Sequence, residues 1–225
     1  MKNQTIPNLL DFKEINYHDN KVLKQALDIY LTHFPPQEIR PLEKTVSMIQ
    51  KDDNYHVLIS LQHETVIGVS LLYIFPSLKF GLLDYMAIIK EFQGRGIGRK
   101  LFNFTFNIFS SRISDGIGIG LLMEIQKDNV QNIEENKIRK NRIKFYINLG
   151  CKFLNGINYL PPSQIGGQPE EMDLMIKPIK NIKSLSKYDV FKIVNAIYSK
   201  IYDYKADNLI DKVFYNTPHL IYIQE

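Results

Sequence analysis

The 225-residue chain contains no tryptophan and only one cysteine, Cys151. A single cysteine cannot form an internal disulfide, which excludes the disulfide-rich secreted scaffolds and fits a reducing compartment. No run of about 18 apolar residues occurs, so we expect no membrane-spanning helix. The first residues, MKNQT, lead into no apolar segment of the kind that a secretory signal needs. These absences predict a cytoplasmic protein with no membrane partner.

The sequence also has little excess charge of one sign, with a net charge of +4. Nucleic-acid binding usually requires a clustered basic face, so we expect no nucleic-acid partner, although the charge is compatible with a small anionic ligand. Histidines with the spacing of a metal site are absent, as is the Gly-x-Ser-x-Gly turn of serine hydrolases, and we expect no metal. A hydrophobic content of 44% with 23% charged residues is typical of a globular protein.

Hydrophobic periodicity predicts that strands and helices alternate along the chain. The predicted strands cover residues 12–17, 55–62, 65–74, 80–89, 117–126, 153–160 and 172–176. The predicted helices cover residues 22–34, 42–50, 96–111 and 136–149, while residues 127–136 are predicted as a polar loop. Pro35 and Pro36 end the first helix, and the short junction at His63 and Glu64 predicts a hairpin. This order predicts an α/β (α+β) fold, a mixed sheet of about seven strands with helices on both faces.

The composition changes after Pro178, and an amphipathic helix is predicted over residues 186–204, with a short second helix over 206–214. We expect residues 1–179 to form the main domain and residues 180–225 a C-terminal helical extension packed on it. The extension is too short to build a good hydrophobic core alone. We expect a monomer or a homodimer.

A glycine-rich segment, Gln93-Gly94-Arg95-Gly96-Ile97-Gly98, lies between a predicted strand and a predicted helix. Glycines there expose backbone N–H groups and let a ligand approach without a Cβ clash. The partial positive charge of a helix N-terminus favours phosphate, and Arg99 adds charge nearby. The segment therefore predicts a site for a phosphate or pyrophosphate, unless the glycines only form a turn.

Three phosphate-binding motifs compete for this segment. A P-loop requires Gly-x-x-x-x-Gly-Lys-Ser/Thr, which is not present. The dinucleotide fingerprint Gly-x-Gly-x-x-Gly fails because the third glycine comes one residue early. The third motif, Gln/Arg-x-x-Gly-x-Gly/Ala, is matched by Gln93, Gly96 and Gly98. The second glycine run, residues 116–120, precedes a strand and is interpreted as a loop and strand entry.

The matching motif is the pyrophosphate turn of the GNAT superfamily of N-acetyltransferases, which the chain resembles from about residue 10 to residue 178. Three more segments carry the resemblance, the first of them just before the turn. Residues 83–88 (LDYMAI) and 121–125 (LLMEI) resemble the family's fourth and fifth strands. Residues 142–151 (RIKFYINLGC) resemble its late helix, although Cys151 stands where the family usually has phenylalanine.

The resemblance implies that acetyl-CoA, or another acyl-CoA, is the co-substrate and that an amine attacks the thioester directly in a ternary complex. Backbone groups of the strand end are implied to bind the pantetheine arm, and those of the glycine turn to bind the pyrophosphate. The implied cofactor-binding residues are Met86, Ala87, Ile88, Gln93, Gly94, Arg95, Gly96, Ile97, Gly98 and Arg99.

Three residues are candidates for catalysis. Tyr146 matches the family tyrosine near the sulfur of CoA, and a phenol with a pKa near 10 can protonate a leaving thiolate. Glu124 lies in an otherwise apolar strand, where burying a carboxylate is unfavourable unless it has a partner or a function. It could accept a proton from the amine, or it could pair with Arg142. Asp84 lies in a similar position and could deprotonate the amine, or it could be an exposed strand-end residue.

Two residues are candidates for binding the acceptor amine. Glu38 lies in the loop after the first helix, which in this family covers the acceptor pocket, but it could equally belong to a solvated loop. Tyr85 neighbours Asp84. The resulting hypothesis is N-acetyl transfer to a primary amine of a small molecule or peptide. The alternatives are transfer of a longer acyl chain from CoA or a carrier protein, and a non-catalytic acyl-CoA-binding module.

Overall fold

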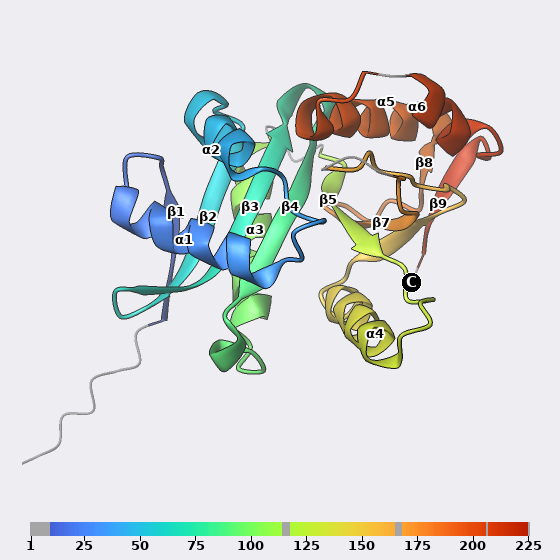
Figure 1. Ribbon diagram of the computed structural model, residues 1–225. Coiled ribbons are helices and arrows are strands. Elements are labelled where there is room, and N and C mark those ends of the chain that lie inside the picture. Colours follow the sequence, from blue (N-terminus) through green and yellow to red (C-terminus); the bar gives the residue numbers. More distant parts are fainter. Residues whose placement is uncertain (1–9, 114–117, 165–167, 206, 225) are drawn as a thin grey trace, which may run out of the picture. The chain divides into compact units, whose positions relative to one another are not determined.

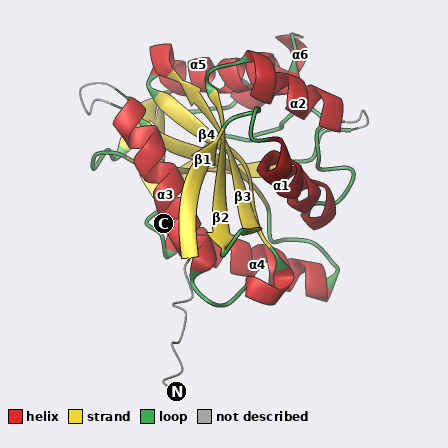
Figure 2. Ribbon diagram, turned by 90° about the vertical axis from the view of Figure 1, so that its left-hand side faces the viewer, coloured by secondary structure: helices red, strands yellow, loops and turns green. Residues whose placement is uncertain are grey.

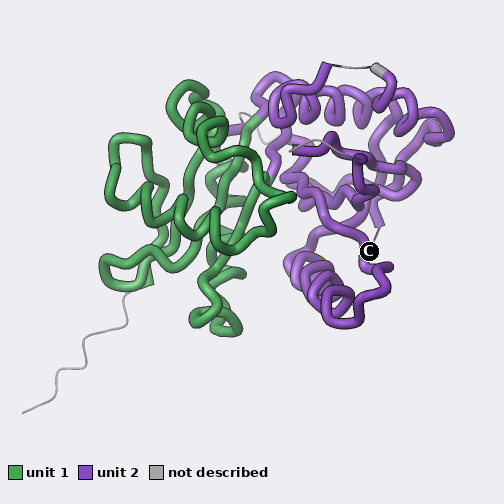
Figure 3. The backbone as a smooth tube through the Cα atoms, viewed as in Figure 1, with its two compact units in different colours: residues 1–74, 83–111 green, residues 75–82, 112–225 purple. Residues whose placement is uncertain are grey.

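The computed structural model describes residues 10–113, 118–164, 168–205 and 207–224. The chain forms two compact units (Figure 3). Unit 1 comprises residues 1–74 and 83–111, and unit 2 comprises residues 75–82 and 112–225. The chain therefore passes between the units three times, on each side of residues 75–82 and again after residue 111.

The elements follow one another along the chain as labelled in Figure 1. The strands are β1 (Leu10–Ile15), β2 (Tyr55–Gln62), β3 (Thr65–Phe75), β4 (Phe80–Ile88), β5 (Gly120–Gln126), β6 (Lys152–Asn155), β7 (Met172–Pro178), β8 (Ser184–Ser186) and β9 (Leu220–Gln224). The α-helices are α1 (Asn20–His33), α2 (Leu42–Lys51), α3 (Ile97–Arg112), α4 (Ile133–Ile147), α5 (Lys187–Ile197) and α6 (Asp207–Phe214). A π-helical turn, η4 (Tyr198–Tyr202), follows α5, and short 3₁₀ turns, η1 (Pro76–Leu78) and η2 (Lys90–Phe92), flank β4.

Unit 1 contains one part of the sheet, in the order β1, β2, β3 and β4. Of β4, only Leu83–Ile88 belongs to this unit. β1 pairs antiparallel with β2, and β2 and β3 form the predicted hairpin, in which His63 turns with φ of 56°. The helices α1 and α3 cover opposite faces of these strands (Figure 2). On the α3 face, Ile97 and Leu101 pack against Ile67 and Ile88.

Unit 2 carries the rest of the sheet. The start of β4, Phe80–Leu82, runs parallel to Gly120–Leu122 of β5, which pairs antiparallel with β7 along its whole length. The order then continues through β6, β9 and β8. Within the described residues the sheet therefore has nine strands, seven of them before residue 180. The predicted mixed α/β fold is confirmed, and the last two strands were not predicted.

Most predicted elements are confirmed within two or three residues. The helix over 22–34 is α1, which ends where Phe34 becomes extended before the two prolines. The helix over 136–149 is α4, whose C-terminus is closed by Gly150 with φ of 80°. The strand expected over 117–126 is β5, and the first residue of that prediction lies outside the described residues.

One helix starts earlier than predicted, and two other predicted elements differ from the structure more strongly. The helix α4 begins at Ile133 inside the predicted polar loop, because the Asn132 side chain accepts a hydrogen bond from Glu135 N and caps it. The strand over 153–160 ends at Asn155, since Gly156 adopts φ of 97°. The long C-terminal helix over 186–204 is divided into α5 and a π-helical turn.

The C-terminal extension contributes strands as well as helices. β9 pairs antiparallel with β6 and with β8, and the helix α5 buries Val190, Ile193 and Val194. The extension is thereby hydrogen-bonded into the sheet of unit 2. The boundary at residue 180 between a main domain and an extension stays a prediction.

Candidate active site

The glycine-rich turn lies in unit 1 between β4 and the N-terminus of α3, as predicted. Gly94 and Gly96 adopt φ of 74° and 76°, which L residues rarely adopt, and a Cβ added at either would meet no atom within 4 Å. The Gln93 side chain donates to the carbonyl oxygen of Ile88 at 2.8 Å and holds the turn against the end of β4. The turn is thus shaped by its own residues and open to a ligand.

The charge around this turn is positive. The first N–H groups of the 16-residue helix α3 have no acceptor within the helix, and the helix dipole adds partial positive charge there. Arg95 and Arg99 are exposed, and the Arg95 guanidinium lies 5.2 Å from the ring centroid of Phe92. Ile97 is buried and Gly98 partly buried in the first turn of the helix. These features fit a phosphate or pyrophosphate group.

The strand end before the turn contains Met86, Ala87 and Ile88, the residues expected to bind a pantetheine arm. Ile88 is buried, while Met86 and Ala87 are partly buried. A Cβ on Gly68 of β3 would lie 2.3 Å from the Ile88 side chain and 3.0 Å from the Ala87 carbonyl oxygen, so β3 needs glycine there. This close packing fixes the end of β4 against its neighbour in unit 1.

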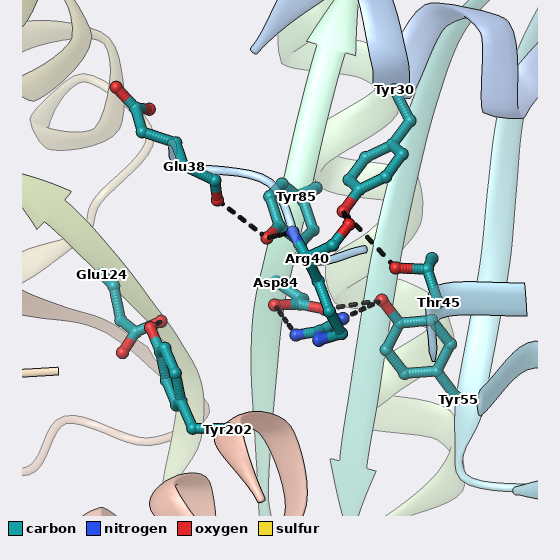
Figure 4. Close-up of polar contacts among 9 residues, drawn as sticks. All are labelled: Tyr30, Glu38, Arg40, Thr45, Tyr55, Asp84, Tyr85, Glu124 and Tyr202. Carbon is teal, nitrogen blue, oxygen red and sulfur yellow. Dashed lines mark hydrogen bonds and ion pairs between the residues drawn. The ribbon is translucent and has the colours of Figure 1, made fainter. Parts of the chain in front are cut away.

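Asp84 lies on β4 within a buried ion pair (Figure 4). The Arg40 guanidinium donates to both carboxylate oxygens, at 2.9 and 3.1 Å, and the Tyr55 hydroxyl donates to Oδ2 at 2.5 Å. The side chains of Arg40 and Asp84 are 0% and 3% exposed. Burial is the largest single effect and lowers the pKa of Arg40, but the charge and hydrogen bonds of Asp84, together with the neighbouring tyrosines, outweigh it and raise that pKa. Asp84 is therefore not the exposed strand-end residue considered as an alternative.

Tyr85 and Glu38, the two residues expected to bind the amine, meet in the same region (Figure 4). The Tyr85 hydroxyl donates to the carbonyl oxygen of Glu38 at 3.0 Å and accepts from the backbone N–H of Arg40 at 3.2 Å. Its ring packs edge-on against Tyr30 and Phe34. Tyr85 and the Arg40–Asp84 pair therefore tie the loop between α1 and α2 to β4.

Glu124 lies on β5 in unit 2 and is bound by two tyrosines. The Tyr159 hydroxyl donates to Oε1, and the Tyr202 hydroxyl donates to Oε2 at 2.9 Å. Burial, and then the charge of Glu124, raise the pKa of Tyr159 far above its usual value, so this phenol stays a donor. Arg142, the partner considered for Glu124, donates instead to the Gln126 side chain at 2.9 Å.

Tyr146 lies near the C-terminal end of α4 and is 7% exposed. Its ring packs edge-on against Phe145, and its carbonyl oxygen accepts from the backbone N–H of Cys151 at 3.0 Å. Burial raises the pKa of Tyr146. The phenol is therefore protonated at neutral pH and keeps a proton that it could donate.

Several residues of these clusters were not predicted. Arg40 and Tyr55 complete the site of Asp84, and Tyr159 and Tyr202 complete that of Glu124. The position of a carboxylate in an apolar strand did indicate that it must have hydrogen-bond or ion-pair partners. Their identity had no local signal, because each partner lies 29 to 78 residues away in the sequence.

The described part of the chain contains no cluster of metal ligands and no membrane-spanning helix. No group of three or more His, Cys, Asp or Glu side chains within residues 10–113, 118–164, 168–205 and 207–224 could hold a metal ion. Over the same residues, no helix has the length and apolar character needed to span a bilayer.

Comparisons with known proteins agree with this architecture. Residues 23–134 match the model of the acetyltransferase (GNAT) family. A GNAT-family protein from Bacteroides thetaiotaomicron aligns with a TM-score of 0.70 and 20% identity, over 87% of this chain and 99% of that one. No curated protein sequence matches the chain significantly.

Two further solved structures align at lower scores. The ribosomal-protein-S18-alanine N-acetyltransferase from Escherichia coli has a TM-score of 0.54 and 20% identity, over 77% of this chain and 96% of that one. NAA60 from Arabidopsis thaliana, in complex with acetyl-CoA, has a TM-score of 0.54 and 18% identity, over 76% and 99%. At these identities the structural likeness establishes the fold.

Proposed function

Since the chain belongs to the GNAT family of acetyltransferases, we propose that it transfers an acetyl group from acetyl-CoA to a primary amine of a small molecule or peptide. The amine attacks the thioester carbonyl directly within a ternary complex. The new bond joins nitrogen to the acetyl carbon, the bond from that carbon to sulfur breaks, and no acyl-enzyme forms.

The observation that carries the proposal is the glycine turn at the start of α3. Two glycines in left-handed conformations, with open space where a Cβ would be, lie at the positive end of a 16-residue helix. Such a turn can place several N–H donors on a pyrophosphate, which is the group that distinguishes CoA from a simple thioester. The residues proposed to bind it are Gln93 to Arg99.

The identities of similar proteins support the choice of donor and acceptor. NAA60 has been captured with acetyl-CoA, and the Escherichia coli enzyme acetylates an alanine of a ribosomal protein. Both are consistent with an amine acceptor and an acetyl donor here. The acetyl-CoA donor supplies an acyl group that is activated as a thioester.

The reaction requires two proton transfers, one from the amine and one to the departing sulfur, and we assign each to a different residue. We assign to Glu124 the acceptance of the amine proton, directly or through a water molecule, because it is a carboxylate held by two phenol donors. We assign to Tyr146 the donation of a proton to the departing sulfur, since it is a phenol and carries its proton at neutral pH. Cys151 is buried and burial raises its pKa to about 12, so it is not the nucleophile.

The remaining candidates position the amine. Asp84 forms a buried ion pair, and its charge neutralises the Arg40 guanidinium. We propose that it anchors the loop that carries Glu38, and that the Glu38 carboxylate and Tyr85 lie on the acceptor side. A cationic amine would be attracted by Glu38.

Calorimetric titration with acetyl-CoA of the wild type, Gly96→Asp and Gly96→Asn tests the donor site. Asparagine tolerates the left-handed conformation nearly as well as any residue with a side chain, and it matches aspartate in shape, so the two variants differ in charge. One unit charge about 4 Å from another costs about 1 kcal/mol in water. Two phosphate charges then correspond to about 2 kcal/mol, or about 30-fold weaker binding by Gly96→Asp than by Gly96→Asn.

Turnover is measured next as release of the free CoA thiol with a panel of primary amines. Acetylation of at least one amine is expected. Equal acetyl-CoA affinity of the two Gly96 variants would show that the pyrophosphate does not bind at this turn. Saturable binding without turnover on any amine would instead favour a non-catalytic acyl-CoA-binding protein.

A further inference from the structure

Glu124 is bound by a residue that the family match does not include. The GNAT family model covers residues 23–134, whereas Tyr202 lies in the C-terminal segment after residue 180. Its hydroxyl donates to Glu124 Oε2 at 2.9 Å across 78 residues of sequence. The hydroxyl of Tyr159 donates to the other carboxylate oxygen. The C-terminal segment therefore supplies one of the two phenol donors on Glu124.

The backbone around Tyr202 is specialised. After α5 the helix widens into the π-helical turn η4, and the next residue, Asp203, is left-handed with φ of 56°. Isolated π-turns are uncommon and occur often at functional sites. A residue other than glycine in the left-handed region also costs free energy, which the surrounding packing must supply.

The packing that holds this turn is provided by Tyr198. Its ring is completely buried and lies within 6.2 Å, centroid to centroid, of the rings of Tyr159, Tyr202 and Tyr204. Its hydroxyl donates to the carbonyl oxygen of Leu160, and its own carbonyl oxygen accepts from Tyr204 N at 2.9 Å. The turn thus has a rigid core that directs Tyr202 at the carboxylate.

We infer that Tyr202 is a positioning residue, which the C-terminal segment supplies to hold the Glu124 carboxylate oriented and ionised for accepting the amine proton. The inference rests on the proposed function for the role of Glu124, but not for the contact itself. One donor on each oxygen fixes the plane of the carboxylate. Hydrogen bonds to an ionised carboxylate also favour that ionised form over the neutral acid.

Three tyrosines interact with Glu124. Tyr159 and Tyr202 bind it through hydrogen bonds, and the Glu124 charge contributes, after burial, to raising the pKa of Tyr198. Opposite Glu124 on the neighbouring strand β7 stands Leu174, an apolar residue. Removing the Tyr202 hydroxyl should therefore leave the carboxylate less stabilised in its charged form.

The test compares Tyr202→Phe with Tyr204→Phe. Tyr204 is a matched control because its hydroxyl binds the Asn208 side chain, at 3.0 Å, on the same segment. We expect Tyr202→Phe to lower kcat by roughly 10- to 100-fold, the range for a lost hydrogen bond to a charged group, and to move the acidic limb of the kcat/KM profile to higher pH. Tyr204→Phe should match the wild type, and Tyr202→Phe should have no further effect in a Glu124→Gln background.

A second measurement does not depend on turnover. NMR titration of a protein labelled with ¹³C at the glutamate carboxyl groups follows Glu124, assigned by its loss in Glu124→Gln. The Glu124 titration midpoint should rise in Tyr202→Phe and not in Tyr204→Phe. An unchanged midpoint together with an unchanged pH profile would overturn the inference. Failure of the wild type to acetylate any amine would refute the proposed function alone, since the titration would still report on Tyr202.

Discussion

Replacing Asp84 by asparagine separates a catalytic from a structural role for this residue. Its carboxylate accepts from Arg40 at 2.9 and 3.1 Å and from Tyr55 at 2.5 Å. Asparagine keeps the shape and one acceptor oxygen but removes the charge that neutralises a guanidinium with 0% side-chain exposure. A buried cation without its partner is unfavourable, so stability should fall.

The size of the effect follows from this burial. Removing one partner of a buried ion pair costs about 3–5 kcal/mol, against a typical total stability of about 5–15 kcal/mol. For a chain of this size each kcal/mol lowers Tm by roughly 2–4 °C, so Asp84→Asn should lower Tm by roughly 6–20 °C. Arg40→Met should cost a similar amount. The double variant should cost less than the sum, with a coupling energy of up to about 3 kcal/mol.

Thermal unfolding followed by circular dichroism measures these shifts, and Glu171→Gln serves as the control. Glu171 pairs with Lys127 at 2.7 Å, but the two side chains are 47% and 28% exposed, so the loss should stay below about 1 kcal/mol. Among the kinetic constants, the amine KM should rise most in Asp84→Asn, because the loop carrying Glu38 loses an anchor. An unchanged Tm with abolished turnover would refute the structural role and make Asp84 a proton acceptor.

Two further predictions concern the buried tyrosines. Tyr146→Phe should lower kcat by up to roughly 10²- to 10⁴-fold, the range of general acid catalysis, while acetyl-CoA affinity measured by calorimetry stays the same. Unchanged turnover would show that Tyr146 has no part in the mechanism. Stability should also fall steeply as pH rises above about 10, because burial raises the pKa of seven tyrosines in the folded protein while unfolded tyrosines ionise near pH 10. Urea midpoints at pH 8, 10 and 11, with tyrosinate absorbance, measure this, and gradual ionisation of all 13 tyrosines without unfolding would contradict it. These seven are Tyr30, Tyr55, Tyr73, Tyr85, Tyr146, Tyr159 and Tyr198.

Local features were predictable from the sequence. The apolar runs that became β2, β3, β4 and β7 have the period and length of strands, and two prolines end α1. The glycine turn was equally visible, since its glycines and the flanking strand and helix are contiguous. The start of α4 could have been found as well, because Asn132 and Glu135 have the spacing of a helix cap.

Partners of the buried carboxylates were not predictable in the same way. The apolar surroundings of Glu124 indicated a partner, and Arg142 was one candidate, but the structure brings Tyr159 and Tyr202 instead. Strands β8 and β9 were missed because three and five residues of ordinary composition carry little pattern. Their pairing depends on β6, which becomes available only when the sheet forms.

The sequence by itself determined most of the elements, the fold class and the glycine turn, because periodicity, prolines and glycines act on neighbouring residues. Only the tertiary structure decided that Arg40 meets Asp84 and that Tyr202 meets Glu124, across 44 and 78 residues. Burial made hydrogen-bond or ion-pair partners necessary for the carboxylates of Asp84 and Glu124, but the sequence offers several arginines and tyrosines that could have served as those partners. Which one does so depends on where the packed sheet and helices place it.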